Sequence, residues 1–218
     1  MRSAPHWILA VLGAALVVPS LAAAQVEPSA DVQAAIDRQK ERSQRRERGL
    51  AAFQEELRPL AESGEPVAQF LLGTMLVGQD PVSAIPYLTR SAEYGCAGAA
   101  GLLAVYSWSS GTGGGDAWLE RAISGGDAAS MFVRATMHMR GDEGFEKSTA
   151  EALAWAELAR ARSYSSGLTP EIERLIGALR SSATPDDAAT AAARFETLAS
   201  QYPKKPFYVC GQSVPSEG

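Results

Sequence analysis

A repeat of constant length is the feature of this sequence that most constrains its fold. Glycines stand at positions 64, 95 and 126, a constant offset of 31 in residue number that we call the repeat length. Small residues recur in the same register, first at Ala68, Ala99 and Ser130 and again at Gly73, Ala104 and Ala135. A fixed period of this length is the signature of stacked supersecondary units.

The segment that precedes each of these glycines repeats as well. Tyr87–Ala92 precedes Gly95, and Trp118–Ala122 precedes Gly126 at the same offset. A third copy, Ala154–Ala159, follows the second at a longer offset, and its six extra residues fall in the loop around 140–147. An earlier half copy occupies residues 57–64.

The spacing of apolar residues indicates that each unit folds as a pair of helices. Ala68, Leu72, Met75 and Leu76 form one apolar stripe, and the glycines end helices and start turns. Because neither helix hides its stripe alone, the units must stack. We therefore predict an all-α fold, a right-handed α/α solenoid of helix-turn-helix repeats over residues 49–167.

The chain beyond the repeats is expected to close the solenoid. Thr169-Pro170 and Thr184-Pro185 each read as a helix start, with Thr at or near the cap and Pro in the first turn. These signals predict capping helices over residues 168–200. Residues 201–218 are rich in proline and are predicted to form an extended tail.

The repeat unit resembles a known family. Ala-x-x-x-Leu-Gly, a polar loop, and Ala-Trp/Tyr-x-x-x-Ala ending in Gly are similar to the Sel-one-like repeat (SLR), a relative of the tetratricopeptide repeat. The likeness covers about residues 50–167 and is best over Ala68–Gly73 and Tyr87–Gly95, while 152–159 resembles the second helix of the family's terminal repeats. Ala104 departs from the family's Gly, and Arg134 stands where a core Leu is expected. The resemblance implies a scaffold for protein–protein interaction, often an accessory of an envelope complex in bacteria.

The first 24 residues are typical of a signal peptide. Arg2 supplies a positive charge, residues 7–18 are apolar, and Ala22–Ala24 offers small residues for cleavage before Gln25. A membrane anchor is the alternative, but spanning a bilayer takes roughly 20 apolar residues. The following segment, 25–48, is polar and charged, which predicts a solvated helix or a linker, with a basic docking segment as the alternative.

Charge and cysteine content narrow the expected environment. The whole chain carries 20 basic and 25 acidic residues, and removal of Arg2 leaves a net charge of −6. This balance predicts neither nucleic acid nor an anionic membrane surface as a partner, and no second apolar run predicts a membrane span after signal cleavage. We expect a periplasmic or secreted protein. An oxidising compartment makes Cys96 and Cys210 a candidate disulfide, with two free thiols as the alternative.

No catalytic, cofactor-binding or metal-ligating residue is predicted. His138 is the one histidine after the signal peptide, and its neighbours Met137 and Met139 indicate packing. The acidic pairs 142–143 and 186–187 are adjacent in sequence and lack metal-ligand spacing. The glycine-rich run 111–115 lacks the Lys-Ser/Thr of a phosphate-binding loop.

The functional hypothesis is therefore an adaptor that binds another protein or peptide of the cell envelope. First helices of stacked hairpins line the concave side, which predicts a partner groove formed by two rows: Thr74, Val105 and Thr136, then Val77, Trp108 and Met139. Such an apolar row suits an amphipathic helix or an extended peptide, unless the capping helices or the tail cover it.

Two rival functions stay open. One is a cell-wall-associated hydrolase or a β-lactam-binding protein, because some exported SLR relatives are linked to β-lactam binding. Those relatives carry a pair of cysteines in each repeat, whereas this repeat region holds one. The other is a glycan binder that stacks sugars on Trp108, Trp118 and Trp155, although the last two occupy the packing position of the repeat.

Overall fold

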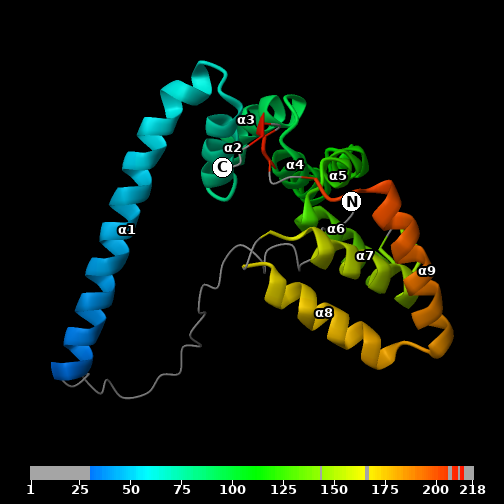
Figure 1. The fold of residues 1–218 in the computed structure, drawn as a ribbon. Coiled ribbons are helices and arrows are strands. Elements are labelled where there is room, and N and C mark those ends of the chain that lie inside the picture. The colour runs from blue at the N-terminus through cyan, green and yellow to red at the C-terminus, as the bar shows by residue number, and fades with distance from the viewer. Residues whose placement is uncertain (1–29, 143, 165–166, 206–207, 211, 214–218) are drawn as a thin grey trace, which may run out of the picture.

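The described part of this chain is all-α, as predicted, apart from one very short pair of strands (Figure 1). The structure is a computed structural model that describes residues 30–142, 144–164, 167–205, 208–210 and 212–213. The expected signal peptide, 1–24, lies outside the described residues. The helices are α1 (Ala30–Glu62), α2 (Pro66–Leu76), α3 (Pro81–Glu93), α4 (Ala97–Ser110), α5 (Gly115–Ser124), α6 (Ala128–Arg140), α7 (Thr149–Arg162), α8 (Thr169–Ser182) and α9 (Pro185–Gln201).

Three turns with the same hydrogen bonds separate successive units. Gly64, Gly95 and Gly126 have φ of 97°, 110° and 92°, a left-handed conformation that favours glycine. At each turn the glycine N–H donates to the carbonyl three residues back, and the next N–H donates to the carbonyl five residues back. This is the Schellman arrangement, which satisfies the last carbonyls of the preceding helix. The glycines therefore act as helix stops, as their spacing predicts.

The helices that follow these turns begin at equivalent positions. α2, α4 and α6 start at Pro66, Ala97 and Ala128, each exactly one repeat length after the last. Glu65 and Asp127 cap α2 and α6 by accepting hydrogen bonds from the backbone N–H of Ala68 and Ser130. Each of these helices packs mainly on its successor, which gives the hairpins α2–α3, α4–α5 and α6–α7.

Small residues let the helices of a hairpin approach closely. Gly73 is buried, and an added Cβ there would lie 2.7 Å from Cγ of Leu88 on α3. Its counterparts Ala104 and Ala135 are fully buried on α4 and α6. The stripe also includes Leu72, another fully buried residue. These positions form the side of each first helix that faces its hairpin partner and the core.

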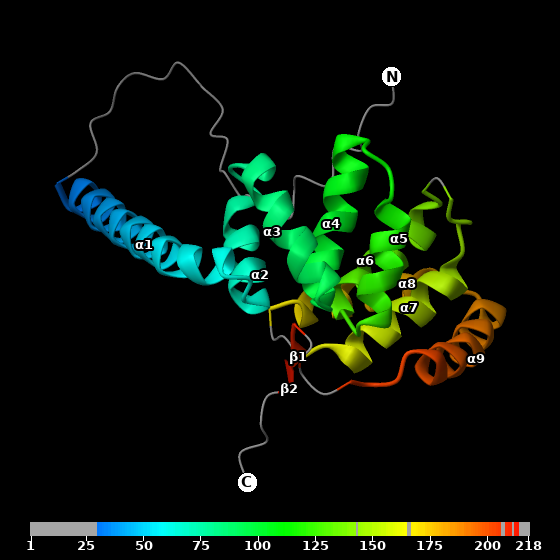
Figure 2. The same cartoon turned by 90° about the horizontal axis from the view of Figure 1, so that it is seen from above.

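Helix α1 runs straight through the boundary expected between residues 48 and 49. It is 33 residues long and ends at Glu62, and in both views its N-terminal part extends away from the other helices (Figures 1 and 2). Leu57 and Ala61, in its last two turns, are buried together with Ala68 and Leu72 of α2. Of the two structures predicted for the charged segment, the described part adopts the helix.

Helices α8 and α9 both pack on α7. Ile172, Ile176 and Leu198 are buried with Leu158 of α7 in the largest core cluster, and in Figure 1 the two helices diverge from their shared corner near residue 184. The tail then crosses back to the first hairpins. There Tyr208–Val209 pairs antiparallel with Gln212–Ser213 on either side of Cys210.

Candidate functional site

The predicted groove residues lie on α2, α4 and α6, except Val77, which is the C-cap residue directly after α2. Thr74 is exposed, whereas Val105 and Thr136, its counterparts on α4 and α6, are half-buried. Both hydroxyls are satisfied within their own helix, because Thr74 Oγ1 donates to the Phe70 carbonyl and Thr136 Oγ1 to that of Val133, each at 2.7 Å. Neither hydroxyl of this row is therefore unpaired.

The second row, one turn further along, is half-buried throughout. Val77 packs against the core cluster that includes Ala84 and Leu88, and Trp108 and Met139 pack against the largest cluster. The Trp108 indole lies over the start of α5, where an added Cβ on Gly115 would be 2.4 Å from its Nε1. All six predicted groove residues therefore keep some exposure, but those of the second row also contribute to the core.

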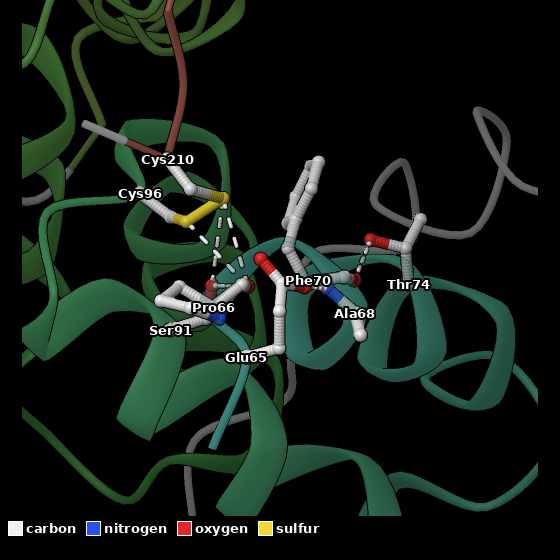
Figure 3. Close-up of a disulfide and its surroundings, with 8 residues drawn as sticks. All are labelled: Glu65, Pro66, Ala68, Phe70, Thr74, Ser91, Cys96 and Cys210. Atoms are coloured by element: carbon white, nitrogen blue, oxygen red, sulfur yellow. Dashed lines mark hydrogen bonds between the residues drawn. A yellow bond between two sulfur atoms is a disulfide. The ribbon is translucent and has the colours of Figure 1, made fainter. Parts of the chain in front are cut away.

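The two cysteines meet where the first two hairpins join. The structure links Cys96 and Cys210 by a disulfide that spans 114 residues, and both residues are buried. Their Sγ atoms lie 3.8 and 3.7 Å from the carbonyl oxygen of Pro66, which also accepts a 2.8 Å hydrogen bond from the hydroxyl of Ser91 (Figure 3). The bond thus holds the tail against the starts of α2 and α4.

Cys96 occupies a position with a regular role in the other units. It is the N-cap residue of α4, one repeat length from each of the acidic caps Glu65 and Asp127, and it makes no side-chain capping bond. Burial raises the pKa of Asp127 above its usual range, and hydrogen bonds from Ser130 act in the opposite direction. The second unit therefore exchanges a capping hydrogen bond for a covalent link to the tail.

A buried arginine in the third unit is the polar feature that sequence reasoning noted but did not interpret. Arg134, at the register of Leu72 and Leu103, is 8% exposed. Its guanidinium pairs with Glu120 of α5 and lies 4.9 Å from the ring centre of Trp155. Among the described residues, its Nε is the buried side-chain nitrogen that has no hydrogen-bond partner.

Further aromatic side chains lie near this arginine. The guanidinium is 5.8 Å from the ring centre of Phe145, and Tyr202 packs on Trp155 with ring centres 5.6 Å apart. Burial and the nearby carboxylate of Glu120 raise the pKa of Tyr202. Because Trp155 is buried in this cluster, it is not available to stack on a sugar.

The residues considered for catalysis are engaged in other contacts. His138 Nδ1 lies 3.1 Å from the carbonyl oxygen of Glu146, and its ring meets Phe145 edge to face. Among the residues that the structure describes, no three His, Cys, Asp or Glu side chains are grouped to hold a metal ion. No helix in the described ranges is long and apolar enough to cross a membrane.

Comparison with known proteins leaves the family open. No protein-family model matches this chain, and no curated protein is significantly similar to it. The resemblance to the Sel-one-like repeat therefore rests on the residues of the repeat unit.

Proposed function

We propose that this chain is an exported helical-repeat adaptor of the Sel-one-like type, a right-handed solenoid that binds another envelope protein or peptide. The recurrence of one turn geometry and one helix start at intervals of one repeat length carries the proposal. Repeated hairpins build extended surfaces from equivalent helices, and such surfaces are typical of partner binding.

The partner face consists of Thr74, Val105, Thr136, Val77, Trp108 and Met139. Its row on α2, α4 and α6 runs across three successive units, so one extended or helical peptide can contact all of them. The partly exposed Trp108 supports a partner with an apolar stripe, since tryptophan is among the residues that contribute most binding energy at interfaces.

Export is supported by the disulfide, because such bonds persist in oxidising compartments. Together with the predicted signal peptide, the disulfide supports a periplasmic or secreted location. Mass spectrometry of the protein from its native host should find a form that begins at or near Gln25. An intact Met1 form held in the membrane would contradict the location.

Capture of partners from the envelope fraction tests the face itself. We expect Thr74→Arg to weaken capture, because it places a charge on the exposed end of the row, and Trp108→Ala to weaken it by at least about 1 kcal/mol. Val82→Arg, on an exposed apolar residue of α3, is the matched control and should leave capture unchanged.

A stability measurement separates the two roles of Trp108. Because its indole packs on Gly115, Trp108→Ala should also lower the melting temperature, whereas Thr74→Arg should not. Unchanged capture with both substitutions together would place the binding surface elsewhere.

A further inference from the structure

Helix α1 presents large apolar side chains that nothing in the described chain covers fully. Leu50, Phe53 and Leu60 are 46%, 43% and 52% exposed. Every side chain that the structure describes from residue 37 to 53 is exposed as well. Most of the stability of a helix in a protein comes from packing of its apolar face, so these side chains indicate a second surface that covers them.

The repeat register indicates that one face of α1 lacks a covering helix. Phe53 and Leu60 stand one repeat length before Ala84 and Ser91, which are fully buried on α3. Those two positions are covered because α2 folds back along α3, with Ser91 bonded to the carbonyl of Pro66 at the start of α2. Since α1 continues straight instead of folding back, the equivalent face of α1 lacks a covering helix.

A hollow at the other end of the molecule can receive apolar side chains. Helices α7, α8 and α9 line this open hollow, which has a volume of about 490 Å³. Its apolar lining comes from Leu153 on α7 and, on α9, from Phe195 and the alanines Ala188, Ala191 and Ala192. Alanine walls leave room for large side chains from another helix.

The two surfaces also carry opposite charge. Residues 37–48 hold six basic and three acidic side chains, a net charge of +3. Helix α9 holds Asp186, Asp187 and Glu196 against Arg194, a net charge of −2. Arg160 and Arg180, which line the hollow, share the carboxylate of Glu157 at 2.6 and 2.5 Å. Arg160 also lies 3.8 Å from Glu173, so these four side chains together carry no net charge and leave the acidic excess of α9 in place.

We infer that α1 of one copy docks into the α7–α9 hollow of a second copy. Leu50 and Phe53 enter between the alanines of α9, and the basic residues of α1 face the acidic residues of that helix. The contact is head to tail, so each copy keeps a free α1 at one end and a free hollow at the other. Such heterologous contacts build chains of subunits unless the rotation closes a ring. This contact uses surfaces separate from the proposed partner face.

Mass measurement of the chain without its signal peptide tests this contact. By light scattering after gel filtration, we expect the mean mass to rise with protein concentration and to fall with added salt, which screens the charged contacts. Phe53→Glu and Ala192→Arg should each give monomers, because each destroys one of the two surfaces. Val82→Glu, an exposed apolar position outside both, should assemble like the wild type.

A mixture of the two variants gives the most specific result. Phe53→Glu keeps an intact hollow and Ala192→Arg keeps an intact α1, so together they should form dimers that grow no further. A wild type that is monomeric at every concentration would overturn the inference, as would normal assembly of Ala192→Arg, which would indicate pairing of α1 with α1. Circular dichroism checks folding, and Leu50→Glu replaces Phe53→Glu if that variant does not fold.

Discussion

Replacement of Arg134 by leucine tests whether the third unit gains stability from its buried charge. The equivalent positions of the first two units are Leu72 and Leu103, both buried. Leucine therefore fits the equivalent position of this repeat, and the side chains around Arg134 come from α5, α7 and the loop before α7. We expect Arg134→Leu to fold and to be more stable than the wild type.

The size of the expected gain in stability follows from the unequal exposure of the two partners of the ion pair to water. The Arg134 side chain is 10% exposed, whereas that of Glu120 is 52% exposed, so water screens the attraction while the guanidinium still loses its hydration. Its unpaired Nε adds a cost of about 1–3 kcal/mol. The contacts of the guanidinium with the aromatic rings stabilise the folded protein by about 0.5–2 kcal/mol. We expect a net gain of about 1 kcal/mol on replacement, or a melting temperature about 2–4 °C higher for a chain of this size.

Removing the charge of the partner, by Glu120→Gln, should instead lower the stability of the protein. Glu120→Gln leaves the guanidinium of Arg134 buried without its counter-charge. Breaking a buried pair in this way costs about 3–5 kcal/mol, and the exposure of Glu120 to water should reduce this to about 1–2 kcal/mol. In the Arg134→Leu background the same substitution should have almost no effect, because its partner is absent.

Urea unfolding followed by circular dichroism measures all four proteins. The expected order of stability is Arg134→Leu, then wild type, then Glu120→Gln. A loss of stability in Arg134→Leu would refute the reasoning. It would mean that the buried cation contributes net stability.

Three further predictions concern the disulfide to the tail, the close contact between α2 and α3 at Gly73, and the buried N-cap residue Asp127. Cys210→Ser should lower the free energy of unfolding by about 2–4 kcal/mol. The chain-entropy model gives an upper value of about 4.7 kcal/mol for a loop of 100 residues. Two free thiols per unfolded, unreduced wild-type chain would show that the disulfide is absent. Gly73→Ala should lower the free energy of unfolding by about 1–3 kcal/mol in a thermal melt, because the added Cβ meets Leu88. The control Gly78→Ala, at a position with open space around it, should leave that free energy nearly unchanged. Asp127→Asn should stabilise the protein at neutral pH, because burial raises the pKa of this carboxyl and so disfavours its ionised form in the folded chain. That gain should shrink as the pH falls through the raised pKa and the wild-type carboxyl becomes neutral, and a gain that grows on acidification would contradict the assignment.

The sequence by itself determined where the helices stop and start in the repeat region. Gly64, Gly95 and Gly126 occupy turns that need a left-handed residue, and the small residues at Gly73 and its counterparts are buried against partner helices. These signals are readable because they are local. A turn conformation depends on the residue that adopts it, and helical spacing depends on neighbours a few residues away.

The tertiary structure alone decided how these helices use their remaining surfaces. The charges of residues 37–48 are compatible with a helix or a linker, and packing of Leu57 and Ala61 on α2 fixes α1 as one continuous helix. The divergence of α8 from α9, and the hollow between them, depends on which residues of α7 each one meets. Local sequence cannot encode these outcomes, because each depends on contacts between residues far apart along the chain, whose packing outweighs the weak preferences of a single segment.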